Sequence, residues 1–109
     1  MPDSQQIDRV FSALANPARR EILALLAERG QRPVQELAEH FDMARPSVSE
    51  HLKVLRDAGL VSEERSGRNR LYSMQIVPLQ QLRLWIDGHE RFWNERMAAF
   101  RAVLDEGDQ

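Results

Sequence analysis

Proline and glycine divide the first 59 residues of the chain into four short segments with helical spacing. Within these segments apolar residues recur every three or four positions, as Ile7, Val10 and Leu14 do, which is the pattern of an amphipathic helix. Prolines stand near the expected helix starts and glycines follow two of the expected ends. We therefore predict helices around residues 7–14, 17–29, 34–41 and 46–58.

After Gly59 the apolar spacing changes from helical to extended. Residues 60–65 and 70–75 predict two strands, and the sequence Ser66-Gly67-Arg68-Asn69 between them favours a hairpin. A helical pattern returns at Pro78 and continues for roughly 27 residues, which at 1.5 Å per residue gives a helix about 40 Å long. Such a helix is longer than one small domain can cover, so we expect it to pack on something outside its own subunit.

The composition narrows the class of protein. We expect residues 1–109 to form one domain with a C-terminal helix over about 78–105. The sequence has no membrane-spanning apolar run, and its polar N-terminal residues lead us to expect no signal peptide. Cysteine is absent, which excludes disulfides and fits a cytoplasmic protein. The sequence has no phosphate-binding loop, zinc-protease helix or nucleophile elbow, so we expect neither an enzyme nor a cofactor.

Charge is distributed unevenly along the chain. The net charge of −2 and the pI of about 5.9, taken alone, argue against a nucleic-acid partner. Residues 45–74, however, carry six basic and four acidic side chains, whereas residues 87–109 carry three basic and six acidic ones. The middle of the chain is therefore locally basic, and the acidic C-terminal part hides this in the total.

Residues 34–58 contain two short predicted helices joined by a tight turn at Asp42-Met43, the arrangement of a helix-turn-helix. The second helix is polar on its outer face and can enter the major groove of DNA, with the basic hairpin as a wing beside it. The candidate DNA contacts on this helix and hairpin are Arg45, Ser47, Ser49, Glu50, Lys53, Arg65, Arg68, Asn69 and Arg70. The alternatives are a helical domain whose polar face is merely solvated and a winged helix that binds another protein.

Three stretches carry a resemblance to a known family: FSALANPARREILALL, ELAEHF and RPSVSEHLKVLRDAGLVSEERSGRNRLYS. From Val10 to Trp85 the chain resembles the ArsR family of bacterial winged-helix repressors. The C-terminal stretch WIDGHERFWNERMAAF resembles the branch of that family that lacks a metal site and often represses its own operon. The resemblance implies a mainly α winged helix-turn-helix: four helices, a two-stranded wing and a last helix.

The resemblance also implies specific contacts to double-stranded DNA. Carried over by position, Arg45, Ser47, Ser49 and His51 would come from the recognition helix, and Arg68 and Arg70 from the wing. His51 lies beside the apolar stripe of its helix, so a structural or phosphate-contacting role competes with base contact. Glu50 departs from the family, whose members more often have a basic or neutral residue there. A carboxylate at this position repels phosphate or accepts a hydrogen bond from a cytosine amine.

The family resemblance further implies a homodimer that represses transcription at a palindromic operator, with the first and last helices at the dimer interface. The candidate interface residues are Ile7, Val10, Phe11, Leu82, Ile86, Trp93, Met97 and Phe100. The last helix is unusually rich in large apolar side chains, Trp85 and Phe92 among them. Two readings remain open: a packed dimer seam, or a pocket for a small apolar effector beneath the two tryptophans.

Founding members of the ArsR family sense metals, which makes a metal site worth testing in the sequence. One family site needs paired cysteines, which the chain lacks. Another begins with Asp-x-His on the last helix, which Asp87 and His89 match. Its second half would fall at Phe100 and Val103, whose side chains cannot bind a metal. We therefore predict no metal site.

Overall fold

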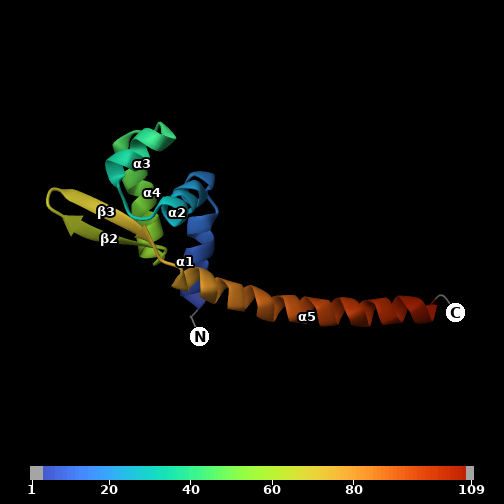
Figure 1. The fold of residues 1–109 in the computed structure, drawn as a ribbon. Helices are drawn as coiled ribbons and strands as arrows, with labels where there is room; N and C mark the ends of the chain where they lie inside the picture. Colours follow the sequence, from blue (N-terminus) through green and yellow to red (C-terminus); the bar gives the residue numbers. More distant parts are fainter. Residues whose placement is uncertain (1–3, 108–109) are drawn as a thin grey trace.

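The computed structural model describes residues 4–107, except for the side chains of Phe100 and of residues 105–107. Most of the fold is helical, with a small antiparallel sheet (Figure 1). In chain order the elements are α1 (Ser4–Leu14), α2 (Pro17–Arg29), β1 (Arg32–Pro33), α3 (Val34–Phe41), α4 (Arg45–Asp57), β2 (Val61–Ser66), β3 (Asn69–Met74) and α5 (Val77–Gly107). The predicted winged helix-turn-helix is confirmed.

α1 begins three residues before the predicted start, and the link between α1 and α2 explains why α1 ends and α2 begins where the sequence predicts. The side chain of Asn16 caps α2 by accepting a hydrogen bond from the Arg19 backbone N–H at 3.2 Å, and Pro17 is in the first turn. The Arg19 guanidinium turns back and donates to the carbonyl oxygens of Ser12 and Ala13, at 3.0 and 2.7 Å. Carbonyls in the last turn of a helix have no partner within the helix, so this arginine joins the end of α1 to the start of α2.

The hydrophobic core lies where α1, α2, α3 and α4 meet, and Leu60 and Tyr72 extend it to the sheet. Ile7, Val10 and Leu82, which the family resemblance placed at a dimer interface, belong to this core and are 4, 1 and 8% exposed. Their own subunit already buries them. The apolar face of a helix can pack inside its own subunit as well as against a partner, and the spacing of its residues is the same in both cases. A second copy of the chain would have to contact their exposed neighbours instead.

The sheet has three strands in the order β1-β3-β2, where the sequence predicted two. The additional strand pairs Arg32 with Tyr72 and Pro33 with Leu71. Two residues, one of them proline, carry no alternating pattern, so this strand could not be predicted from sequence. Proline is tolerated there because β1 lies at the edge of the sheet.

The hairpin of β2 and β3 forms as predicted, but each strand lies one residue nearer the turn. Ser66 pairs with Asn69, which leaves Gly67 and Arg68 as a two-residue turn. Gly67 has a φ of 61°, a left-handed conformation that such turns require and that glycine adopts without strain.

The last helix, α5, determines the shape of the molecule. It has 31 residues and leads away from the other elements, so that the chain measures 72 × 29 × 22 Å (Figure 1). Its first turns pack on the body: Leu82 is buried, and the Trp85 ring meets the Phe11 ring edge-on with centroids 5.4 Å apart. Farther along, Trp93 is 62% exposed. Within residues 4–107 no helix is long and apolar enough to cross a membrane.

Candidate nucleic-acid interface

The turn between α3 and α4 sets the two helices of the helix-turn-helix at an angle. Asp42 ends α3 in the left-handed conformation, with a φ of 50°, which aspartate tolerates better than most residues. The Met43 backbone N–H then donates to the Ala38 carbonyl oxygen at 3.0 Å, satisfying a carbonyl in the last turn of α3. Two residues later α4 begins at Arg45, with Pro46 in its first turn.

One face of α4 is buried and the other faces solvent. Val48, Leu52 and Leu55 are at most 1% exposed and pack in the core, which holds the helix in place. The sequence-predicted contact residues lie outside this stripe. His51 is half-buried, and the exposed ones are Arg45, Ser47, Ser49, Glu50 and Lys53. The structure therefore gathers the α4 candidates on the accessible part of a firmly packed helix.

The hairpin carries the other predicted DNA contacts, and all four of them are exposed: Arg65, Arg68, Asn69 and Arg70. Arg68 stands in the turn, whereas Arg65 and Arg70 are directly opposite each other on β2 and β3. Side chains alternate across a strand, so Arg65 and Arg70 share a face with the cross-strand pair of Glu63 and Tyr72. The hairpin is therefore basic at its tip, with one carboxylate farther along the same face.

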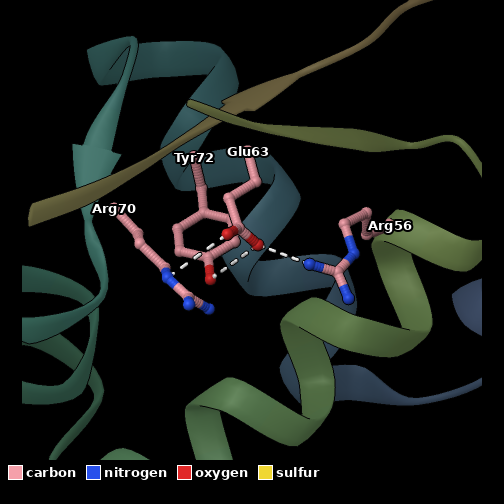
Figure 2. Close-up of polar contacts among 4 residues, drawn as sticks. All are labelled: Arg56, Glu63, Arg70 and Tyr72. Carbon is pink, nitrogen blue, oxygen red and sulfur yellow. Dashed lines mark hydrogen bonds and ion pairs between the residues drawn. The ribbon is translucent and has the colours of Figure 1, made fainter. Parts of the chain in front are cut away.

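That carboxylate, on Glu63, connects the hairpin with α4 (Figure 2). Its Oε2 forms an ion pair with Nη1 of Arg56, in the last turn of α4, and accepts a hydrogen bond from the Tyr72 hydroxyl at 3.3 Å. Its Oε1 lies 3.4 Å from Nε of Arg70. Burial raises the pKa of the Tyr72 hydroxyl above its ordinary value, and the charge and hydrogen bond of Glu63 raise this pKa further.

Sequence reasoning missed this cluster. The charge sum over residues 45–74 counted Arg56, Arg70 and Glu63 as three separate charges, although both arginines contact this one carboxylate. The signal that could have found it is the hairpin register, which sets Glu63 opposite Tyr72 and diagonal to Arg70. The contribution of Arg56 depends on how α4 packs against β2, which no local pattern reveals.

The exposed part of the predicted dimer interface lies on α1 and α5. Phe11, Ile86, Trp93 and Met97 are 41, 45, 62 and 50% exposed. The side chain of Phe100 is outside the described residues. These four exposed side chains form what we call the apolar stripe of the subunit.

Asp87 and His89, which match the Asp-x-His half of a family metal site, both lie on α5. Both side chains are exposed. His89 is also engaged locally: its Nδ1 is 2.8 Å from the Trp85 carbonyl oxygen, and its ring stacks on the Trp85 ring at 3.9 Å between centroids. Among the described residues there is no group of three or more histidine, aspartate or glutamate side chains placed to hold a metal ion.

A surface cavity of about 360 Å³ lies between α1 and α4, away from the two tryptophans. Asp8, Arg9 and Asp57 contribute charged side chains to its lining. Neither Trp85 nor Trp93 lines it, so this cavity is not the pocket beneath the two tryptophans that the sequence left open.

Comparison with known proteins decides the family. Residues 16–63 match the family described as "Bacterial regulatory protein, arsR family". Over 102 residues the chain is 40% identical to the HTH-type transcriptional regulator Rv2034 of Mycobacterium tuberculosis, covering 93% of this chain and 92% of that protein. The chain belongs to the ArsR family. It is a DNA-binding transcriptional regulator and not an enzyme.

Other ArsR-family relatives agree with this assignment. The transcriptional repressor SdpR of Bacillus subtilis is 38% identical over 80 residues, covering 73% of this chain and 88% of the repressor. A crystal structure of an ArsR family transcriptional regulator has a TM-score of 0.78 and 34% identity, covering 85% of this chain and 95% of that one. A homodimeric winged helix-turn-helix DNA-binding domain of Mycobacterium bovis has a TM-score of 0.66 and 30% identity, covering 83% of this chain and 88% of that one.

Proposed function

We propose that this ArsR-family protein is a homodimeric repressor that binds a palindromic operator of its own or a neighbouring operon, in the cytoplasm. The observation that carries the proposal is the exposed polar face of α4 beside a basic hairpin. Five of the six candidate residues on α4 are exposed, as are all four on the hairpin. Because the other face of α4 packs in the core, the helix reaches DNA already ordered, which lowers the entropy cost of binding.

The candidate residues divide into two roles. Arg45 and Ser49 contact base edges in the major groove, and Glu50 accepts a hydrogen bond from a cytosine amine. Arg68 and Arg70 neutralise phosphates, which supplies affinity for any sequence. The remaining proposed contacts are Ser47, His51, Lys53, Arg65 and Asn69.

The dimer in this proposal forms through the apolar stripe of α1 and α5. A homodimeric relative supports it, as does the exposure of Trp93 on a helix that leaves the body of the subunit. The unit is then residues 1–109, with residues 78–105 as the dimerisation helix. A two-fold axis relates the two α4 helices, so the operator has two half-sites about 34–36 Å apart, or a multiple of that distance.

The test is selection of DNA by the purified full-length protein from a library of random-sequence duplexes. We expect enrichment of an inverted repeat whose half-sites are about one helical turn apart, or a multiple of it. Glu50→Gln should change the preferred base at one position of each half-site. Glu90→Gln, which removes the same charge from an exposed position on α5, should leave the selected sequence unchanged.

Failure of the wild-type protein to enrich any sequence would contradict the proposal. It would favour the alternative in which the winged helix binds another protein. Enrichment of a single half-site without a repeat would contradict only the dimeric arrangement.

A further inference from the structure

Glu63 is placed to control how the hairpin and α4 lie relative to each other. The chain leaves α4 through Gly59 and Leu60, and three residues after Leu60 the Glu63 side chain meets α4 again at Arg56. The same carboxylate contacts Arg70 and Tyr72 on β3 (Figure 2). The Glu63 side chain therefore joins α4, β2 and β3, the three elements that carry the proposed DNA contacts.

The environment of Glu63 makes these contacts strong for groups near the surface. Its side chain is 20% exposed, so water screens it less than it screens the hairpin tip. Hydrogen bonds that involve charged partners are stronger than neutral ones, and the planar guanidinium of arginine gives them a fixed direction. Glu63 thus receives two cationic partners and one hydroxyl donor at its two oxygens.

Arg70 remains able to contact a phosphate while Glu63 holds it. The ion pair uses Nε of Arg70, and the side chain is 58% exposed. An arginine has five N–H donors, so others stay available for an anion. A side chain that is ordered before binding loses less rotamer entropy when it binds.

We propose that Glu63 is a positioning residue that fixes the hairpin against α4, orients Arg70 toward the DNA backbone and thereby raises the preference for operator over other DNA. The inference rests on the proposed DNA-binding function. Operator binding requires α4 and the hairpin to contact DNA at the same time in one register. Non-specific binding requires only positive charge, and Glu63 reduces that charge.

The experiment compares the full-length wild-type protein with Glu63→Gln and Glu64→Gln. Glu64 is the next residue on β2, carries the same charge, lies on the opposite face and accepts a hydrogen bond from the Gln31 side chain at 3.1 Å. Affinity is measured for the duplex that the wild type selects and for a shuffled duplex of equal length and composition. The readout is the ratio of the two affinities.

We expect Glu63→Gln to lower this ratio about tenfold or more, the scale of losing one charged hydrogen bond. Glu64→Gln should change the ratio less than about twofold, because it alters the charge alone. A purely structural role for Glu63 would lower both affinities equally through loss of folded protein. An unchanged or increased ratio in Glu63→Gln would therefore overturn the inference.

Arg56→Gln tests the same connection from the side of α4 and serves if Glu63→Gln does not fold. Arg56 is exposed in the last turn of the helix, where substitution is tolerated better than in the core. The ratio should fall in this variant too, and an unchanged ratio would overturn the inference. If the wild type itself shows no preference for the selected duplex, the proposed function fails together with the inference.

Discussion

Replacing Trp93 by glutamate should separate the proposed dimer. Trp93 is 62% exposed, and a tryptophan can bury up to about 250 Å². Covering the exposed part would bury about 150 Å², which at 25 cal/mol per Å² contributes about 4 kcal/mol in each subunit. A two-fold interface contains the residue twice, for at most about 8 kcal/mol. Even half of that would weaken the dimer dissociation constant about 1,000-fold.

The assay is the molar mass in solution by light scattering across a concentration series. Leu84→Glu is the matched control, because Leu84 is also on α5 and is 72% exposed. It lies nine residues from Trp93, about two and a half helical turns, and so on the opposite side of the helix. We expect Trp93→Glu to have the mass of one subunit at micromolar concentration and Leu84→Glu to have that of two.

Two results would refute this reasoning. A wild-type protein with the mass of one subunit at micromolar concentration would show that the apolar stripe pairs with nothing. Dissociation in Leu84→Glu as strong as in Trp93→Glu would show that the stripe does not define the contact.

Three further predictions concern the hairpin and α5. Arg68→Ala should weaken binding to all duplexes alike and reduce the slope of log affinity against log salt concentration by about 1. An unchanged slope would show that the turn of the hairpin does not contact DNA. Stoichiometric zinc, nickel, cobalt or arsenite should leave operator affinity unchanged in titrations, whereas a tenfold loss that disappears in His89→Ala would reveal a metal sensor. The raised pKa of Tyr72 means that its contribution to stability is complete below pH 10 and is lost as the pH rises through the raised value. The free energy of unfolding from urea titrations should therefore fall above pH 10 in the wild type and fall less in Tyr72→Phe.

The helices and the hairpin could be predicted from sequence because their signals are local. Asn16 and Pro17 start a helix through contacts within a few residues, and Gly67 allows the turn of the hairpin. The strand formed by Arg32 and Pro33 could not be predicted, because it forms only by pairing with β3, about 40 residues later in the chain.

The candidate site could be predicted in part, for a related reason. Exposure of Arg45 and Ser49 follows from the helical spacing of the buried residues around them. The family resemblance assigned Val10 to the dimer interface, and helical spacing does not show that its own subunit already buries it. The attachment of Arg56 to Glu63 depends on tertiary packing, so the sequence offered only two unrelated charges.

The protruding α5 also has a consequence for how steeply a gene could be controlled. A subunit whose last helix needs a second copy exists at low concentration as a monomer with one DNA-reading helix. By mass action the amount of dimer then rises with the square of the protein concentration, so doubling the protein gives about four times as much dimer. A repressor of its own operon built in this way would silence its gene more steeply with rising concentration than a repressor that acts as a monomer. The length of α5 and the exposure of Trp93 would thus set the level at which the protein stops its own synthesis.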